Sequence, residues 1–368
     1  MSPAPRPLLV EALGDPPGTL RLTNAQWTLL IQQARAAGLL PRLAFLLDAA
    51  GDLPRVPAGP LHHLESSLVL ARSHDQAVRW EVASIHDALR SAGIPVVLLK
   101  GAAYVMANLP AARGRWFSDV DVMVPRTSLA DAEATLRLSG WIGTHADDAY
   151  DQRYYREWMH EIPPMLHERR RTTLDIHHSI LPPTARLKPD AAKLFAAAVP
   201  VAGHADLHVL APADMVLHSA THLFWDGEFH HGLRDLVDLD DLLRHFDARD
   251  PAFFPTLVDR AFEMDLAEPL QYGLRYTRRI LGTPVPDTAM IALRRAGPGA
   301  LRRPLMDALF DRALMPDHST CSDWLTPTAR WLLFVRAHYL RMPLRLLVPH
   351  LVRKAWRRVK GEDAVHRG

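Results

Sequence analysis

Two aspartates alternate with apolar residues in one short run, which constrains the fold more than any other part of the sequence. The run is Asp119-Val-Asp-Val-Met-Val124, closed by Pro125. Side chains of a β-strand alternate between its two faces, so Asp119 and Asp121 point to the same face, with Cα atoms roughly 6.5–7 Å apart. Two buried carboxylates at this spacing repel each other unless a cation compensates them. The run therefore predicts either a cation site, or a strand end where one Asp faces solvent and the other pairs with an arginine.

Segments upstream and downstream add a lysine and a third carboxylate. The apolar run 96–99 predicts a buried strand that leads into Lys100-Gly101 and then into a helix-compatible stretch. Lys100 is one of five lysines in a chain with 43 Lys and Arg, and a lysine with backbone N–H groups at such a turn can bind a triphosphate. Asp175, in Leu174-Asp-Ile-His177, lies in another apolar strand and can sit beside the first two. Such carboxylates can hold two Mg²⁺ ions about 4 Å apart for phosphoryl or nucleotidyl transfer.

Apolar periodicity predicts helices on both sides of a small mixed α/β unit. A helical pattern over 61–92 ends at Gly93, and another helix runs from Ser128, its N-cap, to Leu138. Strand-like runs over 154–166 and 172–180 form a hairpin across a charged turn. Beyond Pro200 the pattern is helical over 212–224, 234–246, 255–264, 269–280 and 329–359.

These elements predict an α+β fold with a small mixed-sheet core, an N-terminal helical segment and a C-terminal helical domain. The length of 368 residues allows two or three domains and a sizeable core. We expect an N-terminal helical region over 1–92, the α/β core over 93–203, a helical domain over 204–322, and a basic amphipathic helical segment over 323–368.

Composition and charge exclude several classes of protein. The single cysteine, Cys321, cannot form an internal disulfide or a Cys-rich zinc site. No signal-like apolar run opens the chain, and no stretch approaches the ~18 apolar residues of a membrane span, so we expect a cytoplasmic protein. A formal net charge of +2 gives no global field that points to nucleic acid or membrane.

The order of these motifs resembles the uncharacterised nucleotidyltransferase family of the DNA polymerase β-type nucleotidyltransferase superfamily. The segments that carry the resemblance are Leu98-Leu-Lys-Gly101, Arg115-Trp-Phe-Ser-Asp-Val-Asp-Val-Met-Val124, Ser139-Gly-Trp141 and Leu174-Asp-Ile-His177. The chain departs from the superfamily at Ala102, where a serine often follows the glycine, and in the longer loop before Asp119. The α/β core is then expected to be a nucleotidyltransferase core.

The resemblance implies transfer of a nucleoside monophosphate from an NTP, ATP by default, to an acceptor, with release of pyrophosphate. Two Mg²⁺ ions, which Mn²⁺ can replace, would be bound by Asp119, Asp121 and Asp175, and Asp175 could also deprotonate the acceptor hydroxyl. Nucleotide-binding residues would be Lys100, Gly101 and Arg115. Candidate contacts to acceptor or nucleotide are His177, His222, Arg234 and Asp238. The acceptor class stays open between peptide, protein and small molecule.

Histidines and charged pairs in the helical region leave alternatives open. His218 and His222 are four residues apart, a spacing that can bind zinc, and Asp226, His230 and His231 follow nearby. No HExxH motif is present, and His160-Glu161 does not complete one. Arg234 and Asp238 can equally form an intrahelical pair.

The C-terminal segment 324–361 contains no Asp or Glu, and its arginines and lysines alternate with aromatic and aliphatic residues. Such a helix can lie on an anionic membrane, bind nucleic acid, dock a partner, or pack on the core with a solvated basic face. The alternative to an enzyme is therefore a catalytically weak nucleotide-binding or partner-binding module, apposed to a membrane through this segment.

Overall fold

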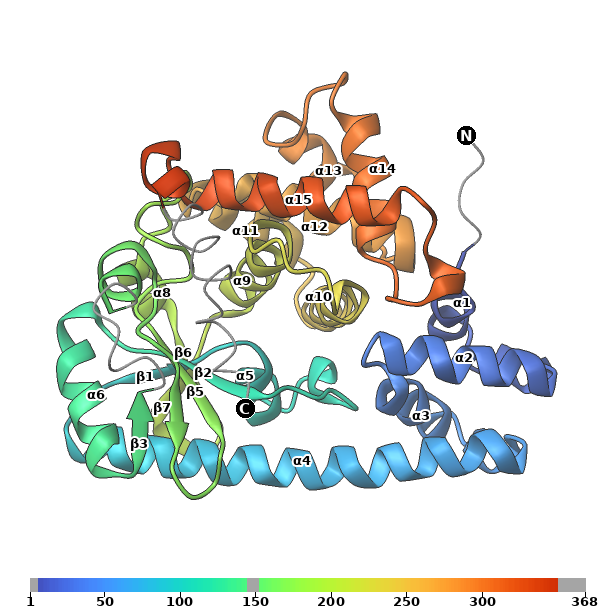
Figure 1. The fold of residues 1–368 in the computed structure, drawn as a ribbon, viewed down its shortest axis with the longest axis horizontal. Helices are drawn as coiled ribbons and strands as arrows, with labels where there is room; N and C mark the ends of the chain where they lie inside the picture. The colour runs from blue at the N-terminus through green and yellow to red at the C-terminus, as the bar shows by residue number, and fades with distance from the viewer. Residues whose placement is uncertain (1–5, 144–151, 350–368) are drawn as a thin grey trace.

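A computed structural model describes residues 6–143 and 152–349. Among these residues, seven strands form one mixed sheet that lies between the long helix α4 and the C-terminal helices (Figure 1). The α+β fold predicted from the sequence is confirmed. Buried apolar side chains from the N-terminal helices, the sheet and the C-terminal helices belong to one continuous core, from Leu9 to Leu333.

The sheet has the strand order β3-β4-β5-β2-β1-β7-β6. The pairs β2–β5 and β1–β7 are parallel, and the others are antiparallel. The strands in chain order are β1 (Val96–Leu98), β2 (Asp119–Met123), β3 (Trp141–Gly143), β4 (Met165–His167), β5 (Thr173–His177), β6 (Val199–Val201) and β7 (His204–Val209). The strand that carries Asp119 and Asp121 therefore lies in the middle of the sheet.

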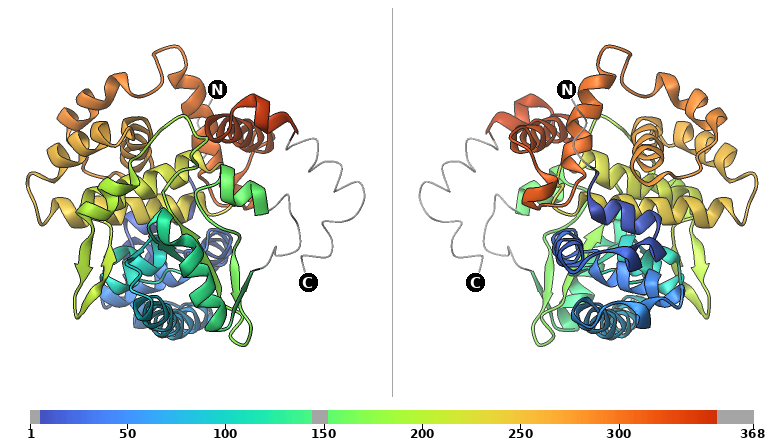
Figure 2. Two further views of the ribbon diagram at one scale, coloured as in Figure 1. Left: turned by 90° about the vertical axis from the view of Figure 1, so that its left-hand side faces the viewer. Right: turned by 90° about the vertical axis from the view of Figure 1, so that its right-hand side faces the viewer.

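Helices cover both sides of this sheet. The longest is α4, which ends two residues before Gly93, whose φ of +68° is the left-handed conformation that a glycine adopts without strain. In the side views α15 lies at the opposite end of the molecule from α4 (Figure 2). The helices are α1 (Leu8–Gly14), α2 (Asn24–Ala36), α3 (Leu40–Ala49), α4 (Ala58–Ser91), α5 (Lys100–Met106), α6 (Leu129–Leu138), α8 (Ala191–Ala197), α9 (Pro212–Trp225), α10 (Gly232–Asp247), α11 (Phe253–Glu263), α12 (Ala267–Tyr276), α13 (Asp287–Ala292), α14 (Arg303–Ala313) and α15 (Thr326–Arg341).

The helix expected over 329–359 ends at Arg341, where Met342 is extended before Pro343. Apart from this helix, local structure differs from the sequence prediction at three places. The first half of the expected strand 154–166 is a π-helical turn, Tyr154–Trp158, and the strand begins only at Met165, because Pro163 and Pro164 have no N–H to donate to a ladder. The hairpin of β4 and β5 is confirmed. Ser128 does precede α6, but its side chain caps no N–H in the described chain.

The third difference is the pair of strands β6 and β7, which occupy 199–209, where the sequence analysis placed no element. The turn between them contains Gly203 with a φ of +81°. β7 pairs with β1, so the sheet extends beyond residue 203. The alternation of His204, Asp206 and His208 with buried Leu207 and Val209 was the signal for this strand.

The basic face of α15 is largely occupied by the protein itself. Arg330 pairs with Asp317, and Arg341 pairs with Asp226. Arg336 pairs with Glu268 and lies over the Trp225 ring, 4.8 Å from its centroid. The cations expected at 353–360 lie outside the described residues. No helix in the described ranges is long and apolar enough to cross a bilayer.

Candidate active site

The register of two neighbouring parallel strands brings the predicted carboxylates together. Asp121 on β2 lies directly opposite Asp175 on β5, and Asp119 and His177 follow two positions away on their own strands. Paired residues of neighbouring strands point to the same face of a sheet, and so do residues two apart. All four side chains therefore lie on one face.

Asp121 is the centre of the polar network on this face. Its side chain is 5% exposed, and its Oδ1 accepts hydrogen bonds from Lys100 Nζ at 3.0 Å and from His177 Nε2 at 2.9 Å. Burial alone would raise the pKa of Asp121, but the Lys100 charge and the His177 hydrogen bond outweigh it and hold the pKa well below its usual range. Asp121 is therefore ionised at any physiological pH.

The pKa values of the other two carboxylates are shifted in the opposite direction, upward. Burial, together with the negative charge of Asp121, raises the pKa of Asp119 and raises that of Asp175 to about 7. The buried Oδ1 of Asp175 has no hydrogen-bond partner among the described residues. A buried acceptor without a donor and a carboxylate with a raised pKa both suit a site that binds a cation.

Lys100 sits in a backbone conformation that its residue type rarely adopts. Its φ is +44°, at the turn where β1 ends and α5 begins. Strain of this kind is tolerated where the surrounding contacts fix the residue, and here the ion pair with Asp121 does so. Burial would lower the pKa of Lys100, but the charge of Asp121 outweighs it and raises the pKa. The lysine is thus a permanent cation beside the acidic strand.

Gly101 is required by the loop that follows α5. A Cβ at this position would lie 2.7 Å from the Phe117 ring, closer than any side chain tolerates. The ring itself contacts His74 of α4 edge-on, with centroids 4.8 Å apart. The absence of a side chain at Gly101 therefore lets the 113–118 loop close over the turn beside Lys100.

Arg115, on the same loop, is fixed to helix α10. Its Nε donates to Asp238 Oδ2 at 2.5 Å, and its Nη2 lies 3.4 Å from Asp235 Oδ1. Arg234 pairs with Asp235 at 2.9 Å, so the intrahelical Arg234–Asp238 pair considered from the sequence does not form. These ion pairs tie the loop before β2 to the helical region.

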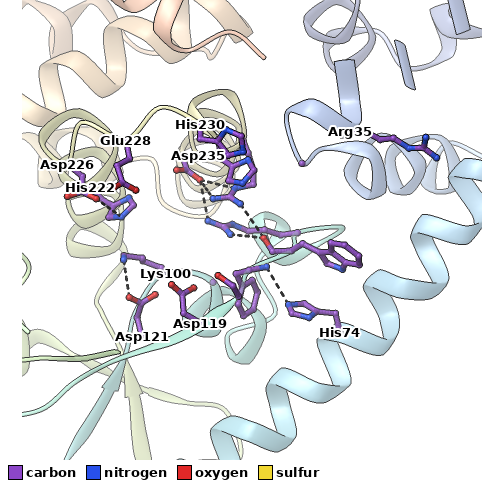
Figure 3. Close-up of a pocket in the computed structure, with 18 residues that line it drawn as sticks. Arg35, His74, Lys100, Asp119, Asp121, His222, Asp226, Glu228, His230 and Asp235 are labelled. Carbon is purple, nitrogen blue, oxygen red and sulfur yellow. Dashed lines mark hydrogen bonds and ion pairs between the residues drawn. The ribbon is translucent and has the colours of Figure 1, made fainter. Parts of the chain in front are cut away.

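A cavity of about 720 Å³ lies between the sheet and the helices. Lys100, Asp119 and Asp121 form its sheet wall, while His222, Asp226 and Glu228 face them from the helical side (Figure 3). Its volume is within the range of sites that bind small molecules and cofactors. The remaining lining residues are Arg35, Gly38, His74, Gly101, Arg115, Trp116, Phe117, Ser118, His230, His231, Arg234 and Asp235.

The residues selected from the sequence fall into two groups. Those on the cavity wall are Lys100, Gly101, Arg115, Asp119, Asp121, His222 and Arg234. The others lie beside wall residues. His177 donates to Asp121 and Asp238 accepts from Arg115, while Asp175 lies opposite Asp121 on β5 without a hydrogen bond to it among the described residues. His218 is buried in α9, 5% exposed.

Several lining residues had no signal in the sequence. Arg35 and His74 come from α2 and α4, in a region expected only to be helical. Glu161, on the segment before β4, does not line the cavity, but its Oε2 lies 3.4 Å from His177 Nδ1. These residues reach the site through tertiary packing, which neither periodicity nor spacing encodes.

Comparison with known protein families gives one match that spans most of this architecture. The model of a family described as an uncharacterised nucleotidyltransferase matches residues 23–282. The chain belongs to this uncharacterised nucleotidyltransferase family. The family resemblance seen in the sequence is confirmed. A search of curated proteins finds no match.

All residues that line the cavity fall within the part of the chain that matches this nucleotidyltransferase family. The helices α13, α14 and α15 lie beyond it. The family match supports an NTP as substrate and a role as a transferase, and the cavity is the place where the carboxylates and cations suited to that substrate converge.

Proposed function

We propose that the cavity binds an NTP with Mg²⁺ and transfers its nucleoside monophosphate to an oxygen of an acceptor. A bond forms between the acceptor oxygen and the α-phosphorus, the bond from the α-phosphorus to the β-phosphate oxygen breaks, and pyrophosphate leaves. The observation that carries the proposal is the set of three carboxylates on adjacent parallel strands, beside a cavity whose walls also carry Lys100 and arginines.

Asp119, Asp121 and Asp175 would hold the metal ions. The partnerless Oδ1 of Asp175 and the raised pKa of Asp119 and Asp175 fit this role, and carboxylate oxygen is the ligand that Mg²⁺ and Mn²⁺ prefer. Bound Mg²⁺ supplies charge neutralisation to the transferred phosphoryl group and orients it.

The remaining residues bind the nucleotide and move a proton. Asp175 would also accept the proton of the acceptor hydroxyl. Lys100 and Arg115 would contact phosphate oxygens, and the pairing of Arg115 with Asp235 and Asp238 fixes its position before the substrate arrives. Gly101, which lines the cavity beside Lys100, would line the triphosphate.

The helical wall would receive the acceptor. His222 Nε2 and Asp226 Oδ2 lie 3.6 Å apart there, opposite the acidic strand. Arg234 lines the same cavity. An acceptor, whether peptide, protein or small molecule, would lie between this wall and Asp119. His177 and Asp238 then act as positioning residues for Asp121 and Arg115, which they contact.

The test is transfer of labelled nucleotide. Purified protein is incubated with each α-labelled NTP, Mg²⁺ and a cell extract as the source of acceptors, and labelled products are separated. We expect one labelled species that disappears with Asp119→Asn and persists with Asp131→Asn, a matched change of an exposed carboxylate on α6. Labelling that survives Asp119→Asn would refute the proposal. NTP binding without any labelled product would instead support the non-catalytic nucleotide-binding module.

A further inference from the structure

A second group of side chains that can bind a metal lies next to the carboxylates. Two of them are on the segment that leads into β4, and the third is on β5. Three ligand atoms lie within 4.8 Å of one another, one from each of His160, Glu161 and His177. The proposed nucleotidyl transfer gives these side chains no role apart from the bond of His177 to Asp121. The cluster differs from the acidic one in chemistry, since two of its three ligands are imidazoles.

The backbone places this cluster firmly. Ile162 N–H donates to Ile176 O at 3.0 Å, and His178 N–H donates to His160 O at 2.8 Å, so the segment is held against β5. Glu161 forms an isolated bridge with His177 between these two bonds. The three ligands therefore come from two backbone segments that are already bonded to each other.

His177 is oriented for binding a metal. Its Nε2 is hydrogen-bonded to Asp121, which leaves Nδ1 directed at Glu161 Oε2, 3.4 Å away. A carboxylate on one imidazole nitrogen and a metal on the other is the usual arrangement around a protein-bound histidine ligand. Here Asp121 is that carboxylate, so it would serve both groups of ligands.

Two buried ring nitrogens in the cluster have no hydrogen-bond partner among the described residues. His160 Nδ1 and His177 Nδ1 make no hydrogen bond within the described chain, although His177 is 2% exposed. Buried polar atoms of this kind normally have a partner.

The spacing suits a transition metal. Ligands on a tetrahedral Zn²⁺ with bonds of about 2.0–2.2 Å lie about 3.3–3.5 Å from each other, and the His177 Nδ1 to Glu161 Oε2 distance of 3.4 Å already matches. The ligand atom of His160 lies within 4.8 Å of the other two. Two imidazoles and one carboxylate favour Zn²⁺ over Mg²⁺, which prefers oxygen ligands throughout.

We propose that His160, Glu161 and His177 bind one first-row divalent transition metal ion, with Zn²⁺ the best fit, next to the carboxylates of β2 and β5. The ion ties the segment before β4 to β5 and fixes the His177 ring that donates to Asp121. It is separate from the Mg²⁺ expected at the aspartates, so it does not depend on transfer activity.

The test uses the full chain, stripped with a chelator and titrated with Zn²⁺ in excess Mg²⁺, with bound zinc measured by elemental analysis and calorimetry. We expect one tight Zn²⁺ per chain. Since loss of an outer partner of a ligand costs about 10–100-fold in affinity, loss of a ligand in His160→Gln or Glu161→Gln should cost at least about 100-fold. Asp175→Asn should keep the zinc, and so should His62→Gln, a change in the exposed His62–His63 pair of α4.

Two results would overturn the inference. Zinc that is lost in Asp175→Asn but kept in His160→Gln would lie at the aspartates, and a wild-type chain that binds no zinc would mean that a proton on His177 compensates Glu161 instead. Visible absorption of the Co²⁺-substituted protein gives a second readout, which should change in His160→Gln. Circular dichroism of the stripped variants checks that each still folds. Neither overturning result affects labelling by NTP, so the two proposals can fail separately.

Discussion

Asp175 makes the stability of the metal-free protein depend on pH in a way that can be calculated. Its pKa is about 7 in the folded protein and about 3.9 in an unfolded chain. The folded state therefore holds a proton that the unfolded state has lost, and stability falls as pH rises from about 4 to about 7. At 1.36 kcal/mol per pKa unit, the penalty reaches roughly 4 kcal/mol above pH 7.

Asp175→Asn removes this penalty because an amide does not ionise. We expect the variant to be more stable than the wild type by only about 1 kcal/mol at pH 4.5, and by up to about 4 kcal/mol at pH 8. With an unfolding entropy of roughly 2.1 cal/mol/K per residue, or about 0.8 kcal/mol/K for 368 residues, this is a rise in Tm of roughly 5 °C.

Scanning calorimetry with a chelator present, at intervals from pH 4.5 to pH 8, measures the effect, and Asp131→Asn serves as the control with an exposed carboxylate. Adding Mg²⁺ at pH 8 should raise the Tm of the wild type and leave Asp175→Asn unchanged, because ligand binding to the native state stabilises it. Parallel curves of Tm against pH for wild type and Asp175→Asn would refute the reasoning, since the aspartate would then ionise normally in the fold.

Three further changes test the contacts around the cavity. Lys100→Met leaves the buried Asp121 with His177 as its remaining partner; we expect a loss of about 3 kcal/mol in chemical denaturation and a loss of NTP-induced thermal stabilisation. Asp238→Asn weakens the hold on the buried Arg115 guanidinium and should cost about 3–5 kcal/mol; an unchanged denaturation midpoint would contradict the pair. Gly101→Ala drives a methyl into the Phe117 ring and should lower Tm and NTP binding, while the double variant with Phe117→Ala should recover Tm.

The acidic strand could be predicted from the sequence because its signal is local. Alternation of Asp119 and Asp121 with valines fixes their shared face, and the next acidic strand supplies Asp175. The register that places Asp175 opposite Asp121 follows from the parallel pairing of β2 and β5, for which both strands had been identified. The long helix α4 could also be predicted from the sequence, because apolar positions recur along its 34 residues.

The missed features depend on contacts between distant parts of the chain. Arg115 and Asp238 are 123 positions apart, and nothing in either segment shows that they pair. The alternation of polar and apolar residues in β7 could be read from the sequence, but its place in the sheet is fixed by the partner β1, more than 100 positions away. Glu161 joins the site because the backbone on either side of it, at His160 and Ile162, is hydrogen-bonded to the chain at β5.

The ion pair between Arg341 and Asp226 links the charge of the cavity to the far end of the chain. Asp226 lines the cavity, while Arg341 is the last residue of α15, beyond the segment that the family shares. Arg341 and His222 outweigh the burial of Asp226 and lower its pKa, so its negative charge is present but balanced. Under the proposed transfer reaction, a family member with the same sheet and a different C-terminal helix would offer its acceptor a wall of different net charge. A change outside the matched segment 23–282 would then alter acceptor choice without altering any residue proposed to bind phosphate.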